Sequence, residues 1–427
     1  MVKISYIEKV NAKSPPDISY IFNTDSFVIR ALAASFSQKL KLEEDWKKTY
    51  EYYNENPEEA KEYVNRVVKG YGHNILQEID YDAIVFDGIS RFATLYLWRN
   101  INTPNETYGA GIETSFRIAK PTKYRGEVEE IYLKCLEAYE ECLNRNIPPQ
   151  DARYLIPMGA TTRMLISANS RYCNKITKAA AQCPLPELQK ISKRLKQIVK
   201  KIGCETDEKV PSKWELFGDS QEKDVSIDIF GKSNDPFSIS LSAYIRGSLS
   251  MYAELVRQRQ LRWNIEPVSR IAEKGRFVIP PSFDEDVKKI YKEIAKKAHD
   301  NQMDLLRKKD PTFAYYLLMG QEATADVYAH SAGAFELSQA RTCGTAQWEI
   351  RNFGTEVAKK LANLGYEKKV GPKCWREGII CTEPNTFKTK YNKCPVLSKR
   401  TSGEKLKLNE ALELLKTEYE VFEVQIS

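Results

Sequence analysis

The sequence predicts an α+β protein with two tandem copies of one unit, in which a sheet packs against long helices. Two observations support this fold class. A short segment typical of a strand precedes an amphipathic helical stripe twice along the chain, and the polar motifs that follow keep the same order in both places. A length of 427 residues, with 42% hydrophobic and 29% charged residues, is typical of a globular protein of two or three domains.

The first copy follows a helical lead-in at residues 42–70. Its predicted elements are a strand at 83–86, a helix with Ile89, Phe92, Ala93, Tyr96 and Leu97 on one face, a turn at 102–106, an extended segment at 116–121, a motif at 152–157, a helix through 162–171, and a last helix with Leu188, Ile191, Leu195 and Ile198 on one side. Stripes of this kind are most simply faces turned towards a core.

The second copy repeats this order. Phe237, Ile239 and Leu241 alternate with serines, as the residues of a half-buried strand do. The elements expected after it are a helical stripe of Ile245, Leu249, Tyr252 and Val256, a turn at 264–266, an extended segment at 277–281, a helix through His330 after the motif at 314–318, and a last helix with Ile350, Phe353, Val357, Leu361 and Leu364 on one face.

These patterns divide the chain into four parts. We expect a first copy at 1–203, a charged linker with Pro211 and Gly218 at 204–223, and a second copy at 224–380. The remainder, 381–427, is expected to be a basic, solvated C-terminal tail that ends in a short helical patch.

Composition argues against several classes of protein. No apolar run is long enough to cross a bilayer and the N-terminus does not begin a secretory signal, so a cytoplasmic protein without a membrane partner is expected. Nine cysteines in no regular framework suggest reduced thiols. Three histidines, and Cys374, Cys381 and Cys394 without a close pair, predict no metal site. The net charge of +7 favours anionic ligands, but its spread along the chain does not favour nucleic acid.

An arginine-rich helix end is the strongest functional signal. Arg257-Gln258-Arg259 is followed by Asn264 and then by Ser269-Arg270. Guanidinium forks and short hydrogen-bonding side chains bind phosphates and the edges of heterocycles. From the spacing alone, a solvated charged face is an equal alternative.

With these motifs in this order, the chain resembles the flavin-dependent thymidylate synthases, also called the thymidylate synthase complementing family. That family has R-H-R-x-x-S-x-N-x-x-S-x-R at a helix end, preceded by G-H-x-x-x-x-E and followed by A-R-x-x-L-P, N-x-R and an arginine before A-Q-W-E-I. Gln258 replaces the family histidine, Arg262 replaces the first serine, and one residue is inserted before Ser269. The similar segments here are 72–78, 257–270, 152–157, 169–171 and 341–350.

Each copy has motif residues that the other lacks. Arg153 in copy one corresponds to Ala314 in copy two, whereas Arg341 in copy two corresponds to Lys178 in copy one. Family members are homotetramers whose active sites are shared between subunits. The resemblance therefore implies that two thymidylate synthase-like units, fused in one chain, assemble one complete site, and that a homodimer forms a pseudo-tetramer.

The resemblance also implies an enzyme that makes dTMP from dUMP, with methylenetetrahydrofolate as carbon donor, reduced FAD as hydride donor and NADPH as reductant. Arg341 is expected to be catalytic, by stabilising negative charge on the uracil ring. The residues expected to bind substrate are Arg153, Glu266, Ser269, Arg270 and Arg341. The residues expected to line the FAD site are His73, Glu78, Asn169, Arg171, Arg257, Gln258, Arg259 and Asn264.

Alternatives stay open. The altered signature is also consistent with another flavin-dependent one-carbon transfer to a pyrimidine nucleotide. An inactive paralogue that binds nucleotides or serves assembly is a second alternative, and a nucleic-acid contact through the lysine-rich tail is a weaker third. For Arg153 and Arg171, a structural ion pair is the alternative to ligand binding.

Overall fold

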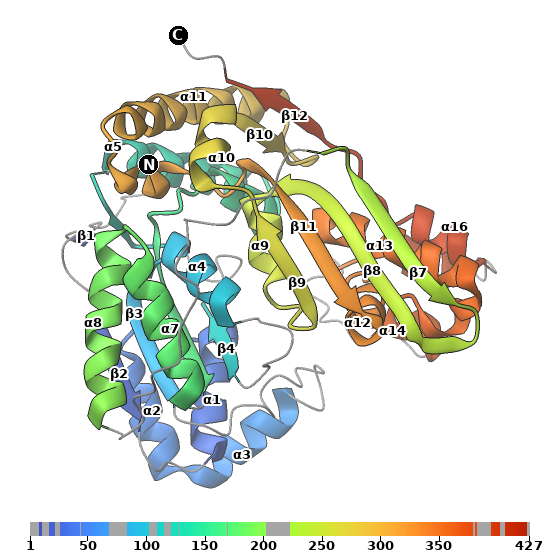
Figure 1. The fold of residues 1–427 in the computed structure, drawn as a ribbon, viewed down its shortest axis with the longest axis horizontal. Helices are drawn as coiled ribbons and strands as arrows, with labels where there is room; N and C mark the ends of the chain where they lie inside the picture. The colour runs from blue at the N-terminus through green and yellow to red at the C-terminus, as the bar shows by residue number, and fades with distance from the viewer. Residues whose placement is uncertain are drawn as a thin grey trace.

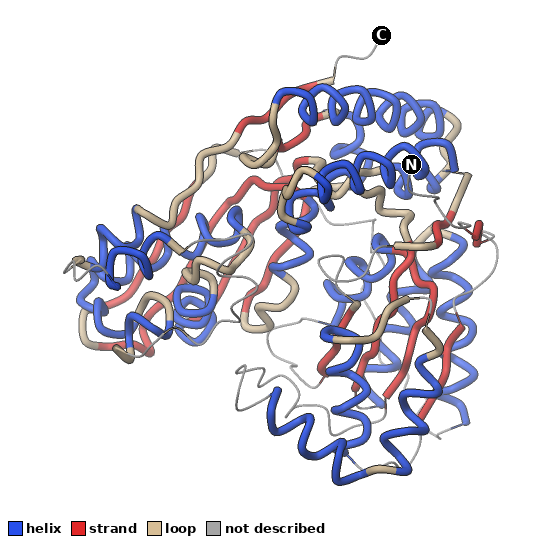
Figure 2. The backbone as a smooth tube through the Cα atoms, turned by 180° about the vertical axis from the view of Figure 1, so that it is seen from behind, coloured by secondary structure: helices blue, strands red, loops and turns tan. Residues whose placement is uncertain are grey.

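The structure is a computed structural model, and it describes residues 8–10, 17–21, 26–42, 44–67, 83–101, 109–114, 121–127, 129–168, 170–201, 223–378, 381, 394–401 and 406–424. Two sheets lie in separate lobes that meet through helices and a short junction (Figures 1 and 2). Within the described residues, no helix is both long and apolar enough to cross a membrane.

The two main sheets have the same topology. In the first, the strand order is β2 (Asp17–Ile21), β3 (Ala83–Ser90), β6 (Thr161–Ala168) and β4 (Gly109–Glu113). In the second, it is β7 (Ser226–Lys232), β8 (Asp235–Ser248), β11 (Glu322–His330) and β9 (Leu261–Ile265). All neighbouring pairs are antiparallel.

The helices follow the strands in a matching order. In the first half they are α4 (Arg91–Ile101), α5 (Glu129–Asn144), α6 (Pro149–Ala152) with the 3-10 turn η3 (Arg153–Leu155), α7 (Ser170–Gln182) and α8 (Pro186–Lys201). In the second they are α9 (Leu249–Leu255), α10 (Val268–Lys274), α11 (Glu285–Arg307), η4 (Pro311–Tyr316), α12 (Ser331–Ala340) and α13 (Trp348–Leu361). One continuous apolar core runs through both halves, and α5 packs along α11.

The two halves meet in a reciprocal backbone junction. Pro157 bridges Leu318, and each half donates to the other: the distance from Met158 N to the Leu317 carbonyl is 2.7 Å, and from Met319 N to the Ile156 carbonyl it is 2.9 Å. Equivalent residues therefore contact each other across a pseudo-two-fold axis, as they do at the isologous interface of a symmetric dimer.

Two buried carboxylates repeat this symmetry in side chains. Glu187 on α8 accepts hydrogen bonds from the Ser90 amide at 2.9 Å and from the Tyr315 hydroxyl at 3.1 Å. In the other half, Glu349 on α13 accepts from the Ser248 amide at 2.8 Å and from the Tyr154 hydroxyl. Each tyrosine reaches across the junction, so each carboxylate joins a helix start in its own half to the opposite half.

The outer faces of the two sheets differ. In the first half α1 (Ser26–Gln38), α2 (Trp46–Glu55) and α3 (Pro57–Asn65), which include the predicted helical lead-in, cover that face. The sheet residues packed under them are the apolar Ala83, Val85, Ile112 and Leu165. Matching strand positions in the second half hold the polar-tipped Ser242, Tyr244, Asn264 and Asp326. The sheet face that the preceding helices cover is thus apolar, whereas the matching face of the second sheet carries polar groups.

Four elements differ from the sequence prediction. Ile89 and Ile245, expected on helices, lie in strands that extend to Ser90 and Ser248 before the helices begin. Strands β6 and β11 stand where helices were expected. In β11 the inward residues alternate, but three of the four are alanine, a strong helix former that hid the two-residue period.

The C-terminal segment was expected to be a solvated tail, and its described part is instead packed. Strand β12 (Glu420–Glu423) pairs with β10 (Arg276–Ile279), where Phe422 lies opposite Phe277 with ring centroids 5.4 Å apart. The predicted helical patch is α16 (Leu408–Glu413), which packs on α13. Most of the predicted linker, 204–223, lies outside the described residues.

Smaller elements complete the described fold. They are β1 (Glu8–Val10), parallel to β5 (Lys123–Arg125), then the π-helical turn η5 (Ala362–Tyr366), η6 (Glu367–Lys369), α14 (Lys373–Arg376) and α15 (Pro395–Thr401).

Candidate functional site

Three arginines from both halves converge on one carboxylate beside the junction. Glu254, in the last turn of α9, is 2% exposed. Its Oε1 lies 3.2 Å from Nη1 of Arg153, and its Oε2 lies 3.4 Å from Nη1 of Arg257 and 3.8 Å from Nη1 of Arg341. We refer to Glu254 with Arg153, Arg257 and Arg341 as the arginine cluster.

Local structure explains this convergence. Arg153 begins η3, immediately before the junction residues, and is therefore held against the opposite half. Arg341 caps the end of α12, and its Nη2 is 3.4 Å from the Glu254 carbonyl. With its amide oxygen towards Arg341, the buried Gln258 accepts hydrogen bonds from Nε and Nη2 at 2.7 Å each. Gln258 thus fixes the plane of the Arg341 guanidinium.

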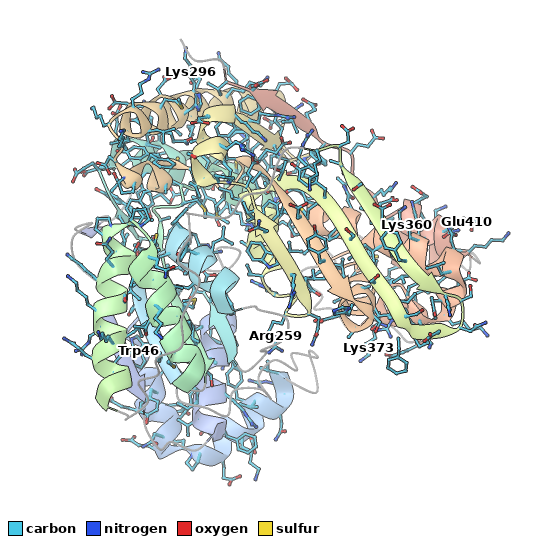
Figure 3. All side chains as sticks on the ribbon, viewed as in Figure 1. Trp46, Arg259, Lys296, Lys360, Lys373 and Glu410 are labelled. Carbon is cyan, nitrogen blue, oxygen red and sulfur yellow. The ribbon has the colours of Figure 1, made fainter. Side chains whose placement is uncertain are left out.

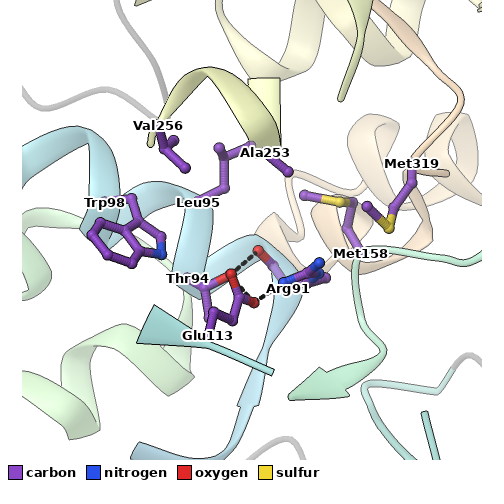
Figure 4. Close-up of a pocket in the computed structure, with 9 residues that line it drawn as sticks. All are labelled: Arg91, Thr94, Leu95, Trp98, Glu113, Met158, Ala253, Val256 and Met319. Carbon is purple, nitrogen blue, oxygen red and sulfur yellow. Dashed lines mark hydrogen bonds and ion pairs between the residues drawn. The ribbon is translucent and has the colours of Figure 1, made fainter. Parts of the chain in front are cut away.

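A fourth arginine enters from the first half. Arg91, at the start of α4, forms a buried ion pair with Glu113 on β4, and Thr94 Oγ1 donates to the same carboxylate at 3.0 Å. Burial lowers the pKa of Arg91 despite Glu113, and the nearby charges of Arg153 and Arg257 lower this pKa further. Figure 4 shows Arg91 and Thr94 both directed at Glu113.

A small cavity lies between the halves at this point. Its lining residues come from α4 and β4 of the first half, from α9 of the second, and from the two junction methionines, Met158 and Met319 (Figure 4). Its volume of about 10 Å³ is enough for one water molecule. Arg91 is the arginine that lines this cavity, together with its partner Glu113.

The electrostatics of the site favour an anion. Four arginines, Arg91, Arg153, Arg257 and Arg341, pair with the two carboxylates Glu113 and Glu254, and Glu336 adds a further negative charge near Arg341, so the group remains net positive. Burial lowers the pKa of Arg341, the negative charge of Glu254 raises this pKa, and the positive charge of Arg257 lowers it. The Arg341 guanidinium nevertheless keeps its proton. Arg153 is 1% exposed, and among the described residues its Nε and Nη2 have no hydrogen-bond partner. Buried donors without acceptors are costly, and these two nitrogens are able to donate hydrogen bonds to an anion.

The pseudo-equivalent position on the other side of the axis lacks this chemistry. Backbone hydrogen bonds show which residues of the two halves are equivalent. In the first half the Arg91 and Phe92 amides donate to the Ala160 and Met158 carbonyls. In the second half the Leu249 and Ser250 amides donate in the same way to the Gln321 and Met319 carbonyls. By the same correspondence, Tyr96 stands where Glu254 stands and Ala314 where Arg153 stands. The Tyr96 hydroxyl donates to the Ala179 carbonyl at 3.1 Å. Among the described residues, the arginine cluster therefore exists on one side only.

The remaining predicted site residues are distributed as follows. Arg259 and Asn264 are half-buried, with Arg259 in the loop before β9 (Figure 3) and Asn264 opposite Asp326 in the sheet. Ser269 and Arg270 lie on α10, which follows the opposite end of β9 from Arg259. His73, Glu78 and Asn169 lie outside the described residues, and Arg171 lies in α7, where its side chain is not described.

Glu266, expected to bind substrate, has structural contacts. It is fully buried, accepts from the Thr324 amide at 2.8 Å and lies 2.9 Å from Nζ of Lys274. This carboxylate thereby ties the end of β9 to β11 and α10.

Sequence reasoning missed Glu254 and Arg91. Glu254 precedes Arg257 by three residues, a spacing that places both on one helical face, so this pair could have been inferred. Nothing in the sequence around Arg91 predicts its approach to Arg153, because that approach depends on how the two halves pack.

The described fold has two similar halves, and residues of both halves form the arginine cluster. A family model described as thymidylate synthase complementing protein matches residues 18–203 and 238–364. The chain therefore belongs to the thymidylate synthase complementing family, whose members are flavin-dependent thymidylate synthases. No curated relative matches the chain. The two matched segments coincide with the two sheet-containing halves, apart from the edge strand β7.

Proposed function

We propose that the chain is a flavin-dependent thymidylate synthase that methylates dUMP to dTMP at one site per chain. The observation that carries this proposal is the meeting of Arg153, from the first matched segment, with Arg257 and Arg341, from the second, on a single carboxylate. The net positive charge of this group of arginines suits a phosphate monoester, which is a dianion. Both groups needed to bind the phosphate and orient the base are thus supplied by one chain.

In this proposal Arg153 binds the dUMP phosphate, because two of its buried nitrogens have no described partner. Arg341, held in plane by Gln258, faces the uracil and stabilises negative charge that develops on the ring. When bound, FAD supplies the hydride, with NADPH as its reductant and methylenetetrahydrofolate as the carbon source. Arg257 fits an anionic cofactor, since its side chain is 41% exposed at the edge of the cluster. The protein's own contribution is to bind, orient and exclude water.

The assembly is proposed to be a homodimer of a fused duplication. The common strand order and the reciprocal junction support an origin of the halves as copies of one unit. Two chains would then give a pseudo-tetramer with complete sites only where an Arg153 meets an Arg341. A cytoplasmic location remains a prediction. Measurement of the mass in solution tests the dimer, and a monomer at working concentration would contradict it.

The activity is tested by the absorbance spectrum of the purified protein with FAD, followed by dUMP titration and by assay of dTMP formation with the folate and NADPH. Arg341→Ala should lower turnover by about 10²–10³-fold and change FAD retention little, as loss of a charge-stabilising donor does. The control is Arg246→Ala, a partly exposed arginine paired with Glu322, which should retain activity. Equal loss of FAD and of turnover in Arg341→Ala would refute the assigned role.

A second candidate function is nucleotide binding without catalysis. The specific observation in its favour is that Gln258, which stands in place of the family histidine, is buried and bonded to Arg341. The same titration separates the two: binding of dUMP with neither flavin absorbance nor dTMP formation would support this candidate.

A further inference from the structure

The centre of the arginine cluster already contains a negative charge. Glu254 touches guanidiniums from α12, from the end of α9 and from η3 of the opposite half, and it is almost completely buried. A carboxylate with this set of partners has the same electrostatic environment that a bound phosphate would require. A ligand phosphate and the Glu254 carboxylate therefore repel each other if both are present.

Space in the site leads to the same conclusion. Arg153 is 1% exposed and Glu254 is 2% exposed, so a phosphate has no direct access to the Arg153 guanidinium. Some side chain has to move before a phosphate can reach Arg153. Arg153 is held from one side by the junction backbone, whereas Glu254 lies at the end of a seven-residue helix.

We propose that Glu254 is a specificity-determining residue that occupies the phosphate position in the ligand-free chain and yields Arg153 to an incoming phosphomonoester. This inference rests on the proposed function for the identity of the natural ligand, but not for the competition itself. Until a phosphate binds, Glu254 offsets the mutual repulsion of the three guanidiniums and holds them around one point. A dianion competes with this monoanion more effectively than a singly charged carboxylate ligand does, so the site selects phosphate monoesters.

The test measures binding of inorganic phosphate to the full chain by isothermal titration, in a buffer that contains no other multivalent anion. Glu254→Gln, which keeps size and removes charge, should tighten phosphate binding by about tenfold or more, because the repulsion between the carboxylate and the phosphate is removed. The matched control is Glu322→Gln, a carboxylate 3% exposed that lies 3.2 Å from Nε of Arg276, outside the cluster. The control should leave phosphate affinity unchanged.

Unchanged or weaker phosphate binding in Glu254→Gln would overturn the proposal and make Glu254 a structural anchor. If that variant does not fold, Glu254→Asp retains the charge and withdraws the carboxylate by one methylene, and it should tighten phosphate binding by a few-fold; no gain overturns the proposal. Titration with dUMP and with deoxyuridine separates this inference from the proposed function. Tighter binding of inorganic phosphate by Glu254→Gln, without any dUMP binding or turnover, would support the role of Glu254 and contradict the thymidylate synthase activity.

Discussion

The two junction carboxylates, Glu187 and Glu349, should respond very differently to the same substitution. Both are buried, and both accept a hydrogen bond from a tyrosine of the opposite half. Glu187, however, lies 2.7 Å from Nε of Arg125, which is 1% exposed. Among the described residues Glu349 forms no ion pair, and its partners are Ser248, Tyr154 and Gln347.

Glu187→Gln would leave the Arg125 guanidinium buried without this counter-charge. Loss of one partner of a buried pair costs about 3–5 kcal/mol. Glu349→Gln should cost about 1 kcal/mol or less, because burial raises the pKa of Glu349 and so already favours its neutral form, to which glutamine is close in shape. The difference between the two variants should therefore be at least about 2 kcal/mol.

The assay is chemical denaturation of both variants and the parent chain at neutral pH. A second readout is the dependence of stability on pH. Since the folded-state pKa of Glu349 is raised, its contribution is fully present below its unfolded value, about 4.3, and is lost as pH rises through the folded value. Glu349→Gln should lack this loss. Equal destabilisation by the two substitutions would refute the reasoning, since it would mean that the charge on Arg125 is irrelevant.

Three further predictions concern the junction, the C-terminus and the asymmetry of the site. Gly159→Ala should destabilise the chain by about 1–3 kcal/mol, because its Cβ would lie 2.8 Å from the Arg125 carbonyl; unchanged denaturation would show that the junction yields easily. Phe422→Ala should lower the free energy of unfolding by about 1–3 kcal/mol, because it removes the ring stacked on Phe277. An unchanged free energy of unfolding would mean that the C-terminal strand does not stabilise the fold. Arg153→Ala should weaken dUMP binding at least about tenfold, as expected for loss of a charge-assisted hydrogen bond. The control, Ala314→Gly at the pseudo-equivalent position, should leave dUMP affinity unchanged. Equal effects would mean that both positions bind substrate.

Much of the site could be predicted from residue types alone. A run of forked cations at a helix end indicated an anion-binding role for Arg257, and the resemblance to the family, with complementary losses in the two copies, implied that Arg153 and Arg341 act with it. Side-chain chemistry and local order are properties of short segments, so they can be read before the fold is known. The helices with long apolar stripes, α8 and α13, were predicted for the same reason, because their 3.6-residue period is unambiguous.

Tertiary structure decided the rest. In β11 alanines at alternate positions are compatible with helix or strand, and only pairing with β8 and β9 selects the strand. The contact between Arg153 and Glu254 joins residues 101 positions apart, and Arg91 reaches the same region from a third element. The sequence by itself determined which charges the protein carries and in what order its two halves present them. Which of those charges meet, and that a carboxylate lies among them, followed only from packing, because contacts between distant segments depend on the geometry of the whole core.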